Sequence, residues 1–122
     1  MPRFVILHHK LPPESSRLSH WDLMLEQEDH LTTWELPEAP VVGTRLNVVP
    51  LANHRLEYLD YEGPLTQQRG TVSRYEWGNY TKVLDDALQQ VVVLHGQALE
   101  GRLTIGKVMG RGKAVPLRLD PA

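Results

Sequence analysis

The sequence predicts an all-β fold, specifically a compact antiparallel β-barrel of about eight short strands with at most one or two short helical turns. Apolar and polar residues alternate in many short segments, which is the pattern of strands that are buried on one face. Turn-forming Gly, Pro, Asn and Asp residues recur about every ten residues. Because the pattern of a long amphipathic helix is absent, we expect the sheet to close on itself and so to leave no exposed edge.

The composition is that of one globular domain spanning residues 1–122. Hydrophobic residues make up 41% and charged residues 23% of the chain, which is ordinary for a protein with a single core. Every apolar run is far shorter than the ~20 residues that span a bilayer, and no signal-peptide pattern is present, so we expect a cytoplasmic protein without membrane contact. The chain has no cysteine, which leaves His, Asp and Glu as its strong metal ligands.

The first predicted strand, residues 3–9, is an apolar run that ends in two histidines. An uninterrupted apolar run of this length indicates a buried strand. His8 and His9 point to opposite faces of such a strand, so one of the two can join a site on a neighbouring strand. Pro12 and Pro13 then favour a loop, because proline fixes φ and removes a backbone donor.

The second predicted strand, residues 17–26, has two chemically different faces. One face carries Trp21, Leu23 and Leu25, and the other carries Leu18, His20, Asp22, Met24 and Glu26. An imidazole and a carboxylate therefore lie side by side, and this pair can bind a divalent cation such as Mn²⁺ or Zn²⁺. A His-x-Asp pair on a strand is also common as a solvated or salt-bridged surface pair, so the spacing leaves both interpretations open.

The middle of the chain contains three further predicted strands. Residues 31–36 alternate and contain β-branched residues, so they are predicted to form a hairpin with the second strand. Residues 44–51 are predicted to be a short strand with a proline of the kind found at sheet edges. Residues 54–58 alternate again, which predicts a strand with His54 and Tyr58 on one face.

The last strands are predicted at residues 70–78, 90–96, 98–108 and 115–119. A tight glycine-containing connection joins the second and third of these. Residues 82–89 can hold one or two helical turns, although residues 79–81 can equally begin another short strand.

Charge is unevenly distributed along the chain, although the net charge is only −2. Between residues 99 and 122, five cationic side chains are accompanied by only two acidic ones. This part of the chain can contact a phosphate backbone or can simply maintain solubility, and the sequence leaves both open. The cationic residues are Arg102, Lys107, Arg111, Lys113 and Arg118.

Several ordered blocks are similar to those of a known family. Residues 4–9 (Phe-Val-Ile-Leu-His-His) resemble Phe-Val-Ile-Gln-Lys-His, and residues 17–26 resemble Arg-Leu-His-Tyr-Asp-Phe-Arg-Leu-Glu with one residue inserted. Residues 31–40, 45–63 and the Leu-x-Gly-x-x-Leu-x-Gly pattern at 94–101 follow in the same order. In this order the blocks resemble the 3′-phosphoesterase domain found at the N-terminus of bacterial DNA ligase D and as a stand-alone protein. The likeness covers about residues 3 to 107.

The resemblance implies a barrel with a pocket on one side that binds Mn²⁺, or another divalent transition metal, through His9, His20 and Asp22. It further implies that His54, Tyr58 and Arg45 are catalytic or phosphate-contacting residues. The implied activity is the removal of a terminal ribonucleoside and then of the 3′-phosphate from DNA or RNA–DNA 3′ ends in DNA repair. An end-joining ligase or polymerase is the implied protein partner, and we expect a monomer.

Two residues depart from the family pattern. Met24 replaces an arginine and Glu38 replaces a lysine, and both changes remove positive charge where phosphate would bind. We expect Met24 to open into a wet pocket beside His20 and Asp22. The alternative function is therefore a catalytically weakened metal-binding or DNA-end-binding module of the same fold, and a pocket for an unrelated phosphorylated ligand is a third reading.

Overall fold

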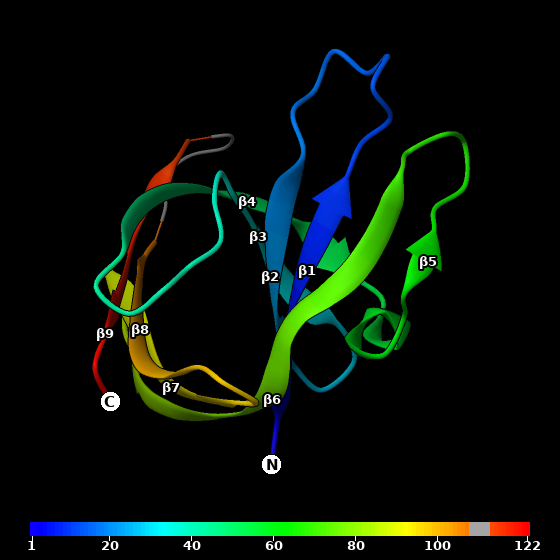
Figure 1. The fold of residues 1–122 in the computed structure, drawn as a ribbon. Helices are drawn as coiled ribbons and strands as arrows, with labels where there is room; N and C mark the ends of the chain where they lie inside the picture. Colours follow the sequence, from blue (N-terminus) through cyan, green and yellow to red (C-terminus); the bar gives the residue numbers. More distant parts are fainter. Residues whose placement is uncertain (108–112) are drawn as a thin grey trace.

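The computed structural model describes residues 1–107 and 113–122, which form one antiparallel sheet (Figure 1). The strands are β1 (Arg3–Lys10), β2 (His20–Glu26), β3 (Leu31–Leu36), β4 (Arg45–His54), β5 (Gly63–Pro64), β6 (Thr71–Asp85), β7 (Gln89–Gly96), β8 (Glu100–Gly106) and β9 (Val115–Asp120). The one helical element among the described residues is a single 3₁₀ turn, η1 (Leu56–Leu59). The predicted all-β class is thus confirmed.

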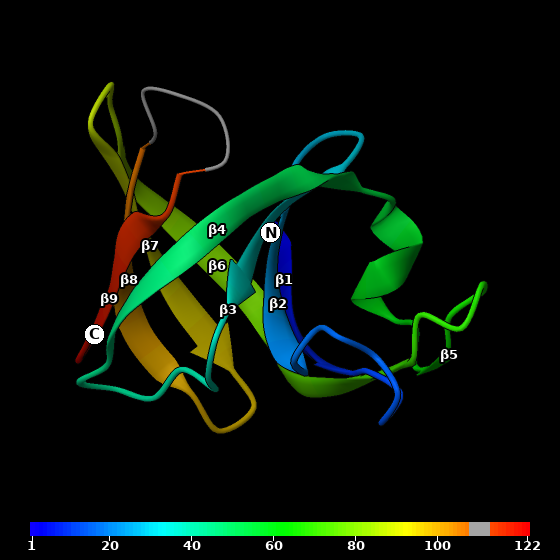
Figure 2. The same cartoon turned by 90° about the horizontal axis from the view of Figure 1, so that it is seen from above.

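Eight of the nine strands close into a barrel in the order β1-β2-β3-β4-β9-β8-β7-β6, and the pairing of β6 with β1 completes it. The two-residue strand β5 pairs only with β6 and lies outside this ring. In Figure 2 the long strand β4 crosses from the β9 side of the barrel to η1, which lies beside β1 and β2. The segment that contains η1 and β5 is therefore an addition to the outer wall of the barrel.

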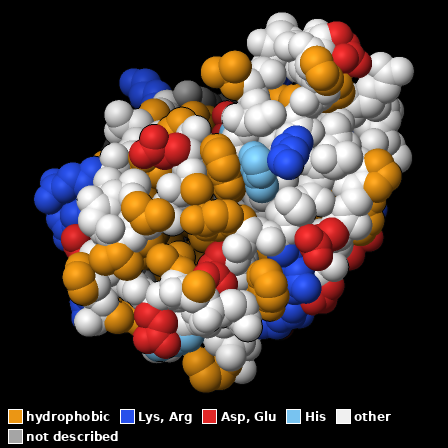
Figure 3. Space-filling model, in the orientation of Figure 1, with side chains coloured by type: hydrophobic (Ala, Val, Ile, Leu, Met, Phe, Trp, Pro, Cys, Tyr) orange, Lys and Arg blue, Asp and Glu red, His pale blue; other side chains and the backbone are white. Residues whose placement is uncertain are grey.

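The interior of the barrel is filled by inward-facing side chains from the eight closing strands. Burying each large aliphatic or aromatic side chain contributes about 1.5–3 kcal/mol. The buried residues of this cluster are Phe4, Ile6, Leu23, Leu25, Trp34, Leu36, Val48, Tyr80, Val92, Leu94, Leu103, Ile105, Val115, Leu117 and Leu119. Figure 3 shows hydrophobic side chains gathered over the barrel on the face of Figure 1, with a few acidic side chains among them.

A second apolar cluster lies on the outer face of β1 and β2. Val5, Leu7 and Met24 point outward and pack against Leu59 of η1 and Val72 of β6. This packing explains the uninterrupted apolar run in β1, because that strand is buried on both faces. Met24 is only 1% exposed, so the expectation that it opens into a wet pocket is wrong. The sequence correctly predicted the face of β2 on which Met24 lies, but the η1 segment covers that face with apolar side chains.

A buried carboxylate fixes the turn between β7 and β8. The side chain of Glu76, on β6, is only 4% exposed. Its Oε1 accepts hydrogen bonds from the backbone N–H groups of Trp77 (3.0 Å) and Gln97 (2.6 Å). Its Oε2 accepts from those of Ala98 (2.9 Å) and Leu99 (2.8 Å). Four backbone N–H groups thus compensate the charge of a buried carboxylate, and three of them tie the β7–β8 turn to β6.

Two predicted elements differ from the structure. Of the two alternatives for residues 79–89, the helical turns are wrong and a strand is present at residues 79–81, because β6 continues to Asp85 and its cross-strand pairing with β7 prevails over local propensity. The strand predicted for residues 54–58 is also wrong, because β4 ends at His54 and η1 follows. The backbone N–H of Tyr58 donates to the carbonyl of Arg55 (3.1 Å), which closes the turn.

Other differences are matters of extent. β2 begins at His20 rather than at residue 17, and β4 is longer than the strand predicted for residues 44–51. Pro50 lies within β4, yet β9 pairs only with residues 45–48 of that strand, so the proline faces a locally unpaired edge. The predicted end of the strand at residue 108 lies outside the described residues. In the described part of the chain, no helix has the length and apolar character that crossing a membrane requires.

Candidate metal centre

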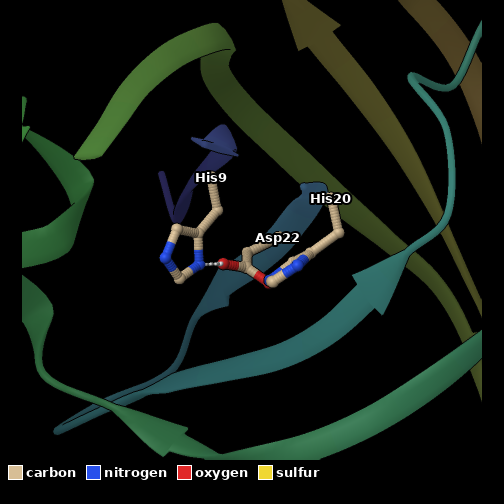
Figure 4. Close-up of side chains that lie close together, drawn as sticks. All are labelled: His9, His20 and Asp22. Atoms are coloured by element: carbon tan, nitrogen blue, oxygen red, sulfur yellow. Dashed lines mark ion pairs between the residues drawn. The ribbon is translucent and has the colours of Figure 1, made fainter. Parts of the chain in front are cut away.

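Three potential metal ligands meet at one end of the β1–β2 pair. His9 lies directly opposite His20 in the register of the two strands, and Asp22 follows two residues later on the same face of β2. One ligand atom from each of the three residues lies within 4.8 Å of the others. Figure 4 shows the carboxylate of Asp22 between the two imidazole rings. The three side chains lie close together because residues that pair across two strands are direct neighbours.

The hydrogen bonds of the two rings determine which nitrogens face the carboxylate. The Nε2–H of His9 donates to the carbonyl of Arg69 (2.6 Å), which leaves its Nδ1 3.5 Å from Oδ2 of Asp22. The Nδ1–H of His20 donates to the carbonyl of Leu18 (3.2 Å), which leaves its Nε2 3.4 Å from Oδ1. Carbonyl partners of this kind orient imidazole ligands in metal sites. Two nitrogen lone pairs and an anionic carboxylate therefore face one another.

Such an arrangement requires a proton or a cation between its members. Oδ1 of Asp22 is fully buried and has no hydrogen-bond partner. A buried anionic oxygen without a partner costs several kcal/mol, roughly what metal coordination would recover. The residues present thus fit a divalent cation, and two imidazoles with one carboxylate are suitable ligands for Mn²⁺ or Zn²⁺.

Without a metal, the two titratable groups of β2 stabilise each other. Burial lowers the pKa of His20, but the adjacent Asp22 carboxylate, which would pair with a protonated ring, outweighs burial, so the pKa is raised overall. Burial likewise raises the pKa of Asp22, but contacts with His20 and His9 outweigh it and lower the pKa overall. The carboxylate is therefore anionic at neutral pH, and it stabilises a proton on His20.

Glu35 is part of this site, although our reading of the sequence did not single it out. It lies directly opposite Asp22 in the β2–β3 register, and its Oε1 is 3.5 Å from Nε2 of His20. Two carboxylates opposite each other repel unless a cation lies between or beside them. Arg17 provides one such cation, because its Nη2 is 2.6 Å from the same Oε1. Trp34 and Leu36 face inward, so strand alternation places Glu35 on the outer face of β3. This pattern could have identified Glu35 from the sequence.

Two cavities extend from the ligand cluster. The larger, of about 350 Å³, is lined by all three ligands together with Glu35, His54 and Arg69 among others. The smaller, of about 100 Å³, is lined by His9, Asp22, Met24, His54, Tyr58 and Arg69 together with apolar side chains. The rings of His54 and Tyr58 lie 5.8 Å apart. The structure therefore brings both residues to the cluster, His54 from the end of β4 and Tyr58 from the η1 turn.

The structure does not bring Arg45 to this site. It lies at the opposite end of β4 from His54, about 30 Å away by strand rise, and pairs in register with Arg118. Both arginines line a separate cavity of about 450 Å³, larger than the one at the cluster but without a metal-ligand group. Glu38 is exposed in the loop after β3 and does not line the cluster cavities. Arg111, one of the five cations near the C-terminus, lies outside the described residues.

His8 faces away from the cluster, on the inner face of the barrel wall. Its ring stacks on that of Trp21, with centroids 4.4 Å apart and planes at 6°. Burial, followed by the charges of Lys10, His20 and His9, lowers the pKa of His8. The two histidines at the end of β1 therefore have different surroundings, and only His9 is placed to act as a ligand.

Comparison with known proteins agrees with this geometry. A family described as the DNA ligase D 3′-phosphoesterase domain matches residues 12–107. A multifunctional non-homologous end joining protein LigD from Pseudomonas aeruginosa is 31% identical over 111 residues, which cover 82% of this chain and 13% of that protein. Two LigD proteins from Mycobacterium bovis and Mycobacterium tuberculosis are each 29% identical over 116 residues, covering 88% of this chain and 15% of theirs.

The chain thus spans about one seventh or less of the length of these relatives. The matched range contains His20, Asp22, His54 and Tyr58 but begins after His9, so the assignment of His9 to the cluster rests on the structure. The match extends through β8 and so covers most of the barrel. By its sequence and its fold, the chain belongs to the DNA ligase D 3′-phosphoesterase domain family.

Proposed function

We propose that this protein is a metal-dependent phosphoesterase that processes nucleic-acid 3′ ends, removing a terminal ribonucleoside and then the 3′-phosphate. The observation that carries the proposal is the cluster of His9, His20 and Asp22, whose ring nitrogens and carboxylate converge beside a cavity. Mn²⁺ is the proposed cofactor, because it accepts both imidazole and carboxylate ligands.

The position of each side chain suggests its role. His9, His20 and Asp22 would hold the metal, which when bound supplies a Lewis acid for a phosphoryl oxygen and lowers the pKa of water. His54 and Tyr58 line the smaller cavity beside the cluster, where the Tyr58 hydroxyl can donate a hydrogen bond to a phosphate oxygen as negative charge develops. The Nδ1–H of His54 donates to the carbonyl of Ala52 (2.9 Å), so His54 would contact phosphate through Nε2 as an imidazolium. The apolar wall formed by the second cluster excludes water on that side, which strengthens these polar contacts.

The proposed substrates are DNA or RNA–DNA 3′ ends in DNA repair. The relatives are named for non-homologous end joining, a process in which damaged ends must be made ready for ligation. An end-joining ligase or polymerase is accordingly the protein partner that we propose.

The direct test uses Mn²⁺ and a duplex with a recessed 3′-phosphate. We expect release of inorganic phosphate that depends on Mn²⁺ and is lost in Asp22→Ala. Asp29→Ala is a matched control, because Asp29 also pairs with a histidine (His30, 2.7 Å) but lies exposed in the β2–β3 turn. Persistence of the 3′-phosphate at high protein concentration, with no difference between wild type and Asp22→Ala, would contradict the proposal.

The burial of Met24 favours a second candidate function, a metal-binding or DNA-end-binding module with weakened catalysis. The family motif has an arginine at this position, whereas here an apolar side chain is packed against Leu59 and Val72. This alternative predicts salt-dependent binding to DNA ends without turnover. Mn²⁺-dependent turnover that disappears in His20→Ala would exclude it.

A further inference from the structure

We propose that Arg69, in the loop between β5 and β6, provides the guanidinium contact to phosphate that Met24 cannot provide. This inference rests on the proposed function, because it assigns the anion-binding group of the same site. Arg69 is one of the residues shared by the two cavities at the cluster, the other shared ones being His9, Asp22 and His54. A phosphate held beside the metal ligands would therefore lie next to this residue.

Arg69 is connected to the metal cluster through its backbone. Its carbonyl accepts the Nε2–H of His9 at 2.6 Å, so the residue that carries the guanidinium also orients one of the ligands. Gly70 follows with φ +89°, and a Cβ at that position would lie 1.9 Å from the carbonyl oxygen of Lys10. The loop is thus fixed against the end of β1 at a point where only glycine fits.

The guanidinium of Arg69 is held in place and still has free donors. Its Nε–H donates to the carbonyl of Thr66 (3.0 Å), and its Nη2 donates to the hydroxyl of the same residue (3.0 Å). Arginine has further N–H groups on Nη1 and Nη2, which remain available for a bidentate contact with phosphate. Anchoring of this kind reduces the conformational entropy that binding must remove.

The loop that carries Arg69 adopts an uncommon backbone conformation. Gln67 and Gln68 have φ angles of 59° and 56°, in the left-handed region that residues other than glycine seldom occupy. Two such residues in succession are retained only where the surrounding structure requires them. Here they reverse the chain immediately before Arg69, so that its side chain returns to Thr66 at the start of the loop.

The other arginines near the site are already paired with carboxylates. Arg17 contacts Glu35 at 2.6 Å, and Arg55 contacts Glu57 at 2.9 Å. Among the described residues, no carboxylate lies within 4.0 Å of the guanidinium of Arg69. An arginine beside the ligands whose charge is not neutralised by the protein is the one best suited to bind an anionic ligand.

The test separates phosphate binding from metal binding. Mn²⁺ affinity is measured by titration of the free metal, and binding of inorganic phosphate to the Mn²⁺-loaded protein is measured by phosphorus NMR line broadening. We expect Arg69→Ala to weaken phosphate binding about tenfold or more, as expected for one lost charge-assisted contact, and to change Mn²⁺ affinity less than about twofold. The carbonyl that contacts His9 is retained in this variant, and Arg69→Lys should recover part of the phosphate affinity.

Arg102→Ala is the matched control, because it removes one exposed arginine from β8 and should leave both affinities unchanged. Unchanged phosphate binding in Arg69→Ala, absence of phosphate binding to the wild type, or an equal loss of Mn²⁺ binding would each overturn the assignment. Arg69-dependent phosphate binding without release of phosphate from DNA ends would support Arg69 and refute the phosphoesterase function. If turnover and phosphate binding are both intact in Arg69→Ala, the phosphoesterase function is supported and the role of Arg69 is refuted.

Discussion

Replacing Glu76 with glutamine should destabilise the barrel, although the side chain keeps its shape and size. Each carboxylate oxygen of Glu76 accepts two backbone N–H groups from residues 77 and 97–99. An amide retains one oxygen, and its NH₂ group would face two N–H donors. Glu76→Gln therefore loses two charge-assisted hydrogen bonds and leaves two backbone donors facing the amide nitrogen of a buried side chain.

The magnitude follows from these contacts. A hydrogen bond to a charged group contributes roughly 1.5–3 kcal/mol, so the loss of two predicts a decrease of about 3 kcal/mol or more in the free energy of unfolding. For a domain of this size the corresponding decrease in Tm is about 12 °C. The side chain cannot turn away to avoid the clash, because it is packed against Gly96, where an added Cβ would lie 2.8 Å from the Glu76 carboxyl carbon.

Urea unfolding followed by tryptophan fluorescence measures this difference. Glu62→Gln is the matched control, since Glu62 is exposed and its side chain accepts one backbone hydrogen bond, from the N–H of Arg74 (2.9 Å). We expect the control to lose no more than about 1 kcal/mol. A loss below about 1 kcal/mol in Glu76→Gln itself would show that the turn does not depend on this carboxylate.

Three further outcomes are expected. Met24→Arg replaces a buried apolar side chain with a charged one, so it should lower the free energy of unfolding, measured by urea titration, by about 3 kcal/mol or more. Unchanged stability would mean that position 24 is open to water. A protonated imidazole cannot bind metal, and the pKa of His20 is raised above its ordinary value of 6.5. Mn²⁺ affinity, measured by calorimetric titration, should therefore fall as the pH drops through this raised pKa. Affinity that does not depend on pH would argue against His20 as a ligand. In the metal-free protein, Asp22 should contribute to stability above its ordinary pKa of 3.8, and this contribution should be lost as the pH falls through its lowered native pKa. In acid unfolding, Asp22→Ala should lack this part of the pH dependence of stability.

The sequence was informative wherever one strand carried the whole signal. Period-two alternation placed His20 and Asp22 on one face of β2 and Leu23 on the other, as the structure has them. The unbroken apolar run of β1 correctly indicated burial. These features are local, so neither needed knowledge of which strands are neighbours.

The sequence was uninformative wherever a contact joins distant segments. Alternation over residues 54–58 fits a strand and a 3₁₀ turn equally well, and only packing of Leu59 on β1 and β2 decides between them. Arg69 approaches His9 across 60 residues, which no local pattern encodes. Arg45 was placed at the site by resemblance, but the length of β4 separates it from His54.

The separation between the barrel wall and the η1–β5 segment has a consequence for divergence within the family. The three candidate metal ligands lie on two adjacent wall strands, whereas Tyr58 and Arg69 belong to a segment whose one strand pairing is the two-residue β5 ladder. Insertions and substitutions in that segment can change the charge and shape presented to a substrate without disturbing barrel closure. If Arg69 binds phosphate as proposed, this segment supplies the cationic group that the barrel wall lacks at Met24, and exchange of the segment between homologues should change substrate preference while leaving the barrel folded.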